Sequence, residues 1–159
     1  MRGRKSKTRP PSSAIVLDTS ALMAVILGEA EGEDCAAVLG TDATFLISAG
    51  TLAEALVVAS NRRIGSQMAA LVGKGGVEVV PVTASTAARV AEAYALWGKG
   101  NHPAGLNLGD CFAYALAKEM NCRLLYVGQD FARTDLTAAK PEAPMGTEHD
   151  GGATDEEPQ

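Results

Sequence analysis

Short apolar runs alternate with longer helical patterns along the central part of the chain. The runs are continuous rather than alternating, as in strands that are covered on both faces of a sheet. They predict strands at Ile15–Asp18, Thr44–Ser48, Val77–Val82 and Leu124–Val127. Apolar residues at helical spacing predict helices at Ser20–Leu27, Gly32–Leu39, Thr51–Ala59, Ile64–Val72, Ser85–Trp97 and Asp110–Met120.

This alternation of strands and helices determines the expected architecture. Strands that are separated by helices favour a central, mostly parallel sheet with right-handed crossovers. We therefore expect an α/β fold in three layers, α/β/α, built as one domain, because compact domains cluster at about 100–150 residues. Ligands of such sheets bind beyond the carboxyl ends of the strands, so the candidate chemistry is expected at that edge.

The distribution of charge divides the chain into a domain and two tails. Residues 1–13 hold five basic groups and no acid, and residues 141–159 hold six acids and no Lys or Arg. We expect a disordered basic tail at 1–13, a folded domain at 14–140 and a disordered acidic tail at 141–159. The basic tail is either an unstructured leader or a modest aid to polyanion binding. The net charge of −5 excludes the large basic surface of a histone-like protein.

The cysteines and the apolar runs indicate a cytoplasmic protein. Cys35, Cys111 and Cys122 form no CxxC pair. The apolar neighbours of Cys111 and Cys122 favour small buried side chains in a reducing compartment. The longest charge-free window, Ala43 to Ala53, is far shorter than the ~18 residues of a membrane span, so no membrane association is expected.

Four acids occupy positions that suggest chemistry. Asp18 ends the first predicted strand and Asp130 follows the last, whereas Glu54 and Asp110 lie near the starts of two strongly apolar helices. Each acid also has an ordinary explanation. Asp18 and Asp110 could cap helices, the latter in a capping box with Asn107. Asp130 could belong to a turn, and Glu54 could lie on a narrow solvent stripe or pair with a distant arginine.

Together the four acids predict a metal site. In a parallel sheet all four approach one edge, where their charges would repel one another without a compensating cation. The sequence has few basic side chains beside them. Mg²⁺ and Mn²⁺ prefer oxygen ligands and keep waters for a substrate phosphate, so we expect one of these ions at this edge.

Four segments resemble a known family. IVLDTSAL, TLAEALVV, LNLGDCFAYALA and LLYVGQDFARTDL, in that order from Ile15 to Leu136, resemble the PIN-domain nucleases, and within them the VapC toxins of bacterial toxin–antitoxin systems. The resemblance implies a PIN-like domain whose catalytic metal centre is formed by Asp18, Glu54, Asp110 and Asp130. It leaves Asp135 as the alternative to Asp130 for the fourth acid.

The same resemblance implies an activity and partners. It implies a Mg²⁺- or Mn²⁺-dependent endoribonuclease that cleaves tRNA or rRNA to 3′-hydroxyl and 5′-phosphate ends. Such toxins are homodimers and are inhibited by a cognate antitoxin. Asp18 and Asp110 would be the principal metal ligands, and Glu54 a ligand or a group that orients the attacking water. Asp130 would hold a second metal or its waters.

Further side chains are candidates to support this site. Ser20 is expected to hydrogen-bond a ligand or a phosphate, and Asn107 to orient Asp110. The candidate RNA phosphate contacts, which could equally be solvated side chains, are Arg62, Arg63 and Arg133. Trp97 and Tyr94, three apart on one helix, are expected in the core rather than against RNA bases.

Other protein classes fit the sequence less well. A phosphoaspartyl phosphatase would need a second Asp two residues after Asp18, where the chain has Ser20. A receiver domain would need paired acids near the first strand and a Lys after the last, and the sequence has neither. A non-catalytic PIN-like module that binds metal and RNA, or a protein partner, stays open beside the nuclease.

Overall fold

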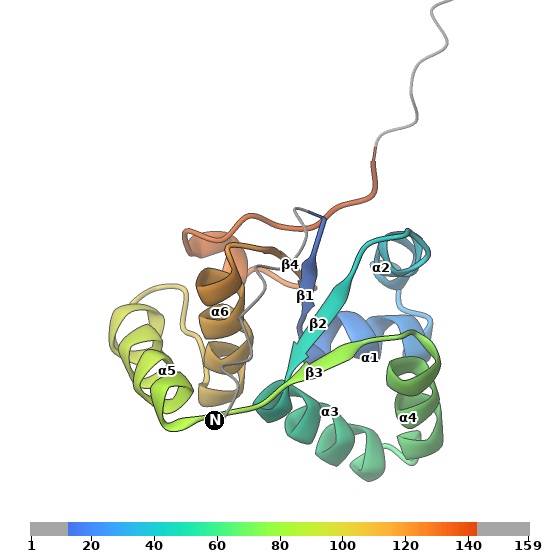
Figure 1. Ribbon diagram of the computed structural model, residues 1–159, viewed down its shortest axis with the longest axis horizontal. Coiled ribbons are helices and arrows are strands. Elements are labelled where there is room, and N and C mark those ends of the chain that lie inside the picture. Colours follow the sequence, from blue (N-terminus) through green and yellow to red (C-terminus); the bar gives the residue numbers. More distant parts are fainter. Residues whose placement is uncertain (1–12, 143–159) are drawn as a thin grey trace, which may run out of the picture.

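Residues 13–142 are described by a computed structural model of the chain (Figure 1). This range contains the whole predicted domain. The predicted tails lie outside the described residues, apart from Ser13, Pro141 and Glu142. The disorder expected of the tails therefore stays a prediction.

Four parallel strands form one sheet within this range. The spatial order is β3-β2-β1-β4. The bounds are Ile15–Leu17 for β1, Phe45–Ser48 for β2, Glu78–Val80 for β3 and Arg123–Leu125 for β4. The predicted strands coincide with these, with ends that differ by one or two residues, and the predicted parallel α/β architecture is confirmed.

Helices cover both faces of the sheet (Figure 1). One layer contains α1 (Thr19–Leu27), α2 (Gly32–Leu39), α3 (Ala49–Asn61) and α4 (Gly65–Lys74). The other layer contains α5 (Ala84–Trp97) and α6 (Leu108–Met120). A short 3₁₀ helix, η1 (Phe131–Arg133), follows β4. All six predicted helices are present, and their ends agree with the prediction within two residues.

Alternate residues of the strands face the two helical layers, as the pleat requires. Ile15 and Leu17 of β1 pack into the core beside α1–α4. Val16 points to the opposite side and packs into the core beneath α5 and α6. β1 is buried on both faces, which explains its continuous apolar sequence.

β3 is more exposed than its apolar sequence predicts. The expectation that both of its faces are covered is wrong, because Glu78 and Val79 are exposed and Val80 is half-buried. β3 is an edge strand, and α5, which follows it in the chain, packs mainly against α6 instead of covering β3. One side of this strand therefore has no helix over it.

α3 also exposes an apolar side. Its strongly apolar sequence suggests burial on every side, but the buried residues of the helix lie on a single side. Leu56 is 40% exposed and Val57 is 61% exposed. Val79 in β3 and Val82, two residues after this strand, are also exposed. We call these four exposed apolar residues of α3 and the β3 edge the outer apolar surface.

The remaining predictions about burial are partly confirmed. Cys35 and Cys111 are buried and Cys122 is half-buried, and all three thiols are free.

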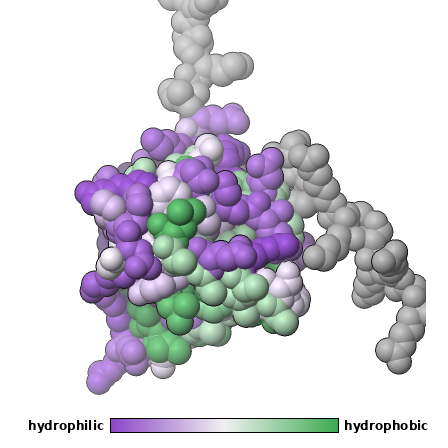
Figure 2. Space-filling model, turned by 90° about the vertical axis from the view of Figure 1, so that its left-hand side faces the viewer, coloured by the Kyte–Doolittle hydropathy of each residue, from purple (hydrophilic) through white to green (hydrophobic). Residues whose placement is uncertain are grey.

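No helix among residues 13–142 is long and apolar enough to cross a membrane. Figure 2 shows the α5 side of the molecule, where polar residues dominate the upper part and apolar residues gather in the lower part.

Candidate active site

Asp18 lies at the carboxyl end of the central strand β1. Its backbone is extended, and its side chain caps α1, so the predicted capping role is present. The Oδ2 atom accepts hydrogen bonds from the Ser20 amide at 3.0 Å and from the Ser20 hydroxyl at 2.6 Å. The Oδ1 atom is buried and has no hydrogen-bond partner within the described residues. One oxygen thus holds the side chain in place while the other is left without a donor.

Ser20 connects Asp18 to the end of β4. The Ser20 hydroxyl donates to Asp18 and also accepts from the backbone N–H of Val127 at 3.0 Å. Val127 precedes the turn that leads to Asp130. Ser20 therefore orients the Asp18 carboxylate and fixes it relative to the segment that carries the fourth candidate acid.

Glu54 reaches the same region from the second turn of α3. The Thr19 hydroxyl lies 3.4 Å from Glu54 Oε2 and 3.4 Å from the backbone oxygen of Thr51. The Glu54 carboxylate also lies against Gly109, at the first turn of α6, since an added Cβ there would be 2.7 Å from Glu54 Cδ. Glu54 thus faces the start of α6 instead of lying on the solvent stripe of its own helix.

Asp110 is held in the capping box that the sequence predicts. The Asn107 backbone N–H donates to Asp110 Oδ2 at 3.0 Å, and Asn107 Oδ1 accepts from the Asp110 amide at 2.8 Å. Asn107 therefore orients Asp110, as expected, through ordinary helix capping.

The pKa values connect the four acids electrostatically. Burial raises the pKa of Asp18, with a further contribution from the charge of Asp130. Burial also raises the pKa of Glu54, and the charge of Asp18 adds to it. For Asp110, burial and then the charges of Asp18, Glu54 and Asp130 raise the pKa to about 6, although the Asn107 hydrogen bond opposes this. Asp18, Glu54 and Asp110 thus each sense the charge of at least one other candidate acid.

Within residues 13–142 no Lys, Arg or His forms an ion pair with any of these four acids. The described ion pairs join Arg89 to Glu119 and Lys118 to Asp135. No three described acidic, His or Cys side chains already form a compact ligand cluster. The four acids therefore share an electrostatic environment without forming a preassembled coordination shell.

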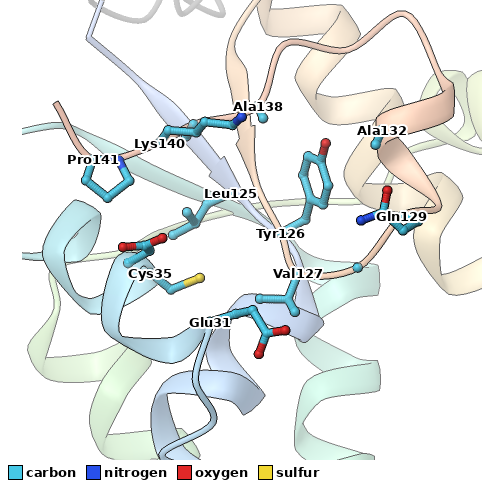
Figure 3. A pocket seen from close by; sticks show the side chains of 13 residues that line it. Glu31, Cys35, Leu125, Tyr126, Val127, Gln129, Ala132, Ala138, Lys140 and Pro141 are labelled. Atoms are coloured by element: carbon cyan, nitrogen blue, oxygen red, sulfur yellow. The ribbon is translucent and has the colours of Figure 1, made fainter. Parts of the chain in front are cut away.

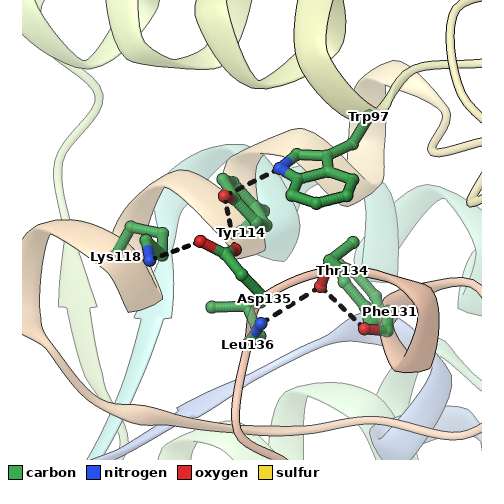
Figure 4. A network of polar contacts seen from close by, with 7 residues as sticks. All are labelled: Trp97, Tyr114, Lys118, Phe131, Thr134, Asp135 and Leu136. Carbon is green, nitrogen blue, oxygen red and sulfur yellow. Dashed lines mark hydrogen bonds and ion pairs between the residues drawn. The ribbon is translucent and has the colours of Figure 1, made fainter.

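Asp130 and Asp135, the two candidates for the fourth acid, have different surroundings. Asp130 is exposed, precedes η1, and raises the pKa of both Asp18 and Asp110. Asp135 instead accepts from the Tyr114 hydroxyl and from Lys118, both at 2.8 Å (Figure 4). The Lys118 contact lowers the pKa of Asp135. Asp130 is therefore the acid that interacts with the others.

The candidate RNA contacts do not gather at the acids. Arg62 is the C-cap of α3, about 12 Å along the helix axis from Glu54 at 1.5 Å per residue, and Arg63 follows it. Arg133 is exposed, and its Nη1 donates to the backbone oxygen of Pro103 at 3.1 Å. Arg133 therefore connects η1 to the loop that precedes α6.

The aromatic prediction for α5 is half right. Trp97 is half-buried, packs against the core beneath α6 and donates through Nε1 to the Tyr114 hydroxyl at 2.8 Å (Figure 4). Tyr94 is 36% exposed, so its expected core position is wrong. Val90, Ala93 and Trp97 form the inner side of α5, which leaves Tyr94 on the outer side.

One cavity lies beside this region without containing it. It has a volume of about 500 Å³ and lies between α2 and the end of β4 (Figure 3). Cys35 and Glu31 line it on the α2 side, and Val127, Gly128 and Gln129 line it on the β4 side. The cavity adjoins the turn that leads to Asp130, but Asp18, Glu54 and Asp110 do not line it.

Sequence reasoning missed two residues of the site. Thr19 is buried and its hydroxyl contacts Glu54. The hydroxyl that directly follows the strand-end acid was a signal for this contact. Gly109 contacts Glu54 across two helices, and no local pattern reveals such a contact.

A family model now identifies the domain. The PIN domain model matches residues 15–136, nearly all of the described chain. The chain belongs to the PIN-domain family. Ribonuclease VapC30 of Mycobacterium tuberculosis is 38% identical over 131 residues, which cover 80% of this chain and 100% of that protein. Ribonuclease VapC of Mycolicibacterium smegmatis is 36% identical over 127 residues, which cover 78% of this chain and 98% of that protein.

These relatives assign this PIN domain to the VapC ribonuclease toxins of toxin–antitoxin systems. Solved structures share its fold. VapC20 of Mycobacterium tuberculosis, a toxin that cleaves the sarcin–ricin loop, matches with a TM-score of 0.65 and 19% identity over 80% of this chain and 99% of that chain. A toxin–antitoxin complex from Klebsiella pneumoniae matches with a TM-score of 0.60 and 18% identity, over 79% of this chain and 96% of that chain.

The side chains of this PIN domain fit a divalent cation. Asp18 Oδ1 is a buried carboxylate oxygen without a donor, which is the kind of atom that a bound cation satisfies. The four acids supply only oxygen ligands, as Mg²⁺ and Mn²⁺ prefer. Within residues 13–142 no basic side chain forms an ion pair with them.

Proposed function

We propose that this VapC-type chain is a Mg²⁺- or Mn²⁺-dependent endoribonuclease that hydrolyses phosphodiester bonds of tRNA or rRNA in the cytoplasm. The observation that carries the proposal is the buried Asp18 Oδ1, which has no donor and is coupled by charge to other acids that lack basic partners in the described range. Membership of the VapC ribonucleases supports the RNA substrate.

Three of the acids are proposed as metal ligands. A bound divalent ion would neutralise the substrate phosphate and lower the pKa of a coordinated water. Asp18 and Asp110, whose carboxylates are already oriented by hydrogen bonds, would be its principal ligands. Asp130, at the end of the turn between β4 and η1, would hold a second ion or its waters.

Glu54 is the acid suited to act on the attacking water. Its raised pKa makes it a better proton acceptor than an ordinary solvated Glu. Water adds to phosphorus and gives up a proton to Glu54, the bond from phosphorus to O3′ breaks, and O3′ takes a proton from solvent. The products are a 3′-hydroxyl and a 5′-phosphate. Arg133 in η1, three residues after Asp130, and Arg62 and Arg63, just after α3, would contact flanking phosphates.

Cleavage in vitro tests this function. We expect the antitoxin-free protein to cut tRNA or rRNA with Mg²⁺ or Mn²⁺, and to stop cutting when EDTA removes the metal. The new 5′ ends should be ligatable, since they carry phosphate. Cleavage that persists in EDTA, or a 2′,3′-cyclic phosphate product, would contradict the mechanism. RNA binding without cleavage would instead favour the non-catalytic module.

A cognate antitoxin is proposed as the regulatory partner. The structural relatives include toxin–antitoxin complexes from Klebsiella pneumoniae and Rickettsia felis. We expect expression of this chain alone to arrest growth of a bacterial host. Coexpression of the antitoxin should restore growth, and continued growth without the antitoxin would contradict the toxin role.

The outer apolar surface is proposed as the homodimer interface. Val57 is the most exposed member, at 61%, and an uncovered apolar surface favours association. Val57→Lys is expected to yield monomers by light scattering without loss of the helical circular-dichroism signal. Leu96→Lys on α5 is the matched control, because Leu96 is 57% exposed but lies outside this surface. A Val57→Lys dimer would exclude this interface.

A further inference from the structure

α3 and α6 meet at their first turns through two glycines. Gly50 and Glu54 are four residues apart and therefore share one side of α3, while Gly109 and Phe112 are three apart and share one side of α6. The Phe112 ring lies against Gly50, where an added Cβ would come within 2.8 Å of ring atom Cε1. The Glu54 carboxylate lies against Gly109, so each helix receives a large side chain from the other.

The backbone does not require glycine at position 109. Gly109 is the second residue of α6, and it is not among the glycines with positive φ. Alanine is the better helix former by about 1 kcal/mol in a helix interior. The feature that distinguishes this position is space: an added Cβ would lie 2.7 Å from Glu54 Cδ and 2.8 Å from Oε1.

The space above Gly109 determines where Glu54 can be. Gly109 directly precedes Asp110 in the chain. Because the Glu54 carboxylate lies against Gly109, it is held near Asp110. The positive end of the α6 dipole also favours a negative charge at this position. The Thr19 hydroxyl contacts the same carboxylate at Oε2 from the α1 side.

We propose that Gly109 is a positioning residue for the active site: its missing side chain leaves the space in which the Glu54 carboxylate lies beside Asp110. This inference rests on the proposed metal-dependent function. A methyl group at position 109 displaces the Glu54 carboxylate, because the close atoms belong to the carboxyl group itself and the helix backbone is fixed by the capping box.

Mn²⁺ affinity of the intact protein, measured by isothermal titration calorimetry, tests the proposal. Gly109→Ala is expected to weaken Mn²⁺ binding by about 10–100-fold, the range found when groups that orient metal ligands are lost. Gly73→Ala is the control, because Gly73 is a helical glycine with nothing within 4 Å of an added Cβ. Wild-type affinity in Gly109→Ala would overturn the proposal.

A second substitution separates positioning from general packing. Glu54→Asp shortens the side chain, so in Gly109→Ala/Glu54→Asp the carboxylate clears the new methyl group. We expect the double variant to bind Mn²⁺ more tightly than Gly109→Ala alone. Binding losses that simply add would overturn the proposal.

Thermal melts in EDTA keep the proposal testable should Gly109→Ala fold poorly. In a Glu54→Ala background the close contact is gone, and Gly109→Ala is expected to raise the melting temperature. A fall of the same size in both backgrounds would assign Gly109 to packing alone and overturn the inference. A wild-type protein that binds no Mn²⁺ would contradict the proposed metal-dependent function itself. That result differs from wild-type affinity in Gly109→Ala, which contradicts only the role of Gly109.

Discussion

Asp18→Asn is expected to reduce RNA cleavage on the order of 10³-fold, which corresponds to about 4 kcal/mol of transition-state stabilisation. Asp18 is 3% exposed, and its Oδ1 is the buried oxygen without a donor. Asparagine keeps an oxygen that can accept from the Ser20 amide but removes the negative charge that a divalent ion requires. Single-turnover cleavage with Mn²⁺ measures the effect.

The same substitution is expected to stabilise the metal-free protein. Burial raises the pKa of Asp18, which means that the ionised form is disfavoured in the folded state. The neutral amide avoids that penalty, so the melting temperature in EDTA should rise. Asp135→Asn is the matched control: it removes an exposed acid bound to Lys118 and Tyr114 and should leave cleavage unchanged. A lower melting temperature with retained cleavage would identify Asp18 as structural.

Stability in EDTA is expected to increase when the pH falls from 7.5 to 5. The pKa of Asp110 is raised to about 6 from an ordinary value of 3.8, and those of Asp18 and Glu54 are also raised. At pH values between the ordinary pKa and the raised pKa of the folded state, the folded protein binds more protons than the unfolded protein. Stability is therefore gained as the carboxyls protonate, and it is lost as the pH rises through the folded-state pKa. Thermal melts across this range measure it.

Mn²⁺ is expected to reverse this dependence. At pH 7.5 an ion at 100 times its dissociation constant contributes about 2.7 kcal/mol, which is roughly a 10 °C rise in melting temperature for a domain of this size. At pH 5 protons compete for the same carboxylates, so the rise should largely disappear. Asp110→Asn should flatten the metal-free profile. An equal Mn²⁺ effect at both pH values would contradict a site made of these acids.

Local patterns predict most of the fold. The apolar runs at β1 and β2 are buried because helices cover both faces, and the α2 prediction agrees at both ends. The same kind of run at β3 misleads, because burial of an edge strand depends on where the next helix packs. The burial of Val57 and Tyr94 is mispredicted for a related reason, since both side chains are exposed. An apolar side chain in a helix does not by itself show whether another part of the protein covers it.

The candidate site is predictable only as far as its individual acids. Asp18 and Asp110 are indicated by their positions at a strand end and a helix start. Asp18 also caps α1 and Asp110 belongs to the capping box of α6, so the structural and the chemical explanation hold together. The contact of Glu54 with Gly109 joins residues 55 positions apart, as the sequence numbers show. It depends on how two helices cross, which no spacing within either segment encodes.

The hydrogen bonds around Ser20 determine how much of the chain must be synthesised before the candidate active site can form. The Asp18 amide donates to Leu125, and the Ser20 hydroxyl accepts from Val127. The ribosome synthesises these partners more than 100 residues apart, and a domain generally folds as a unit during synthesis. Under the proposed function, the nascent chain therefore has no assembled active site until almost the entire domain has left the exit tunnel.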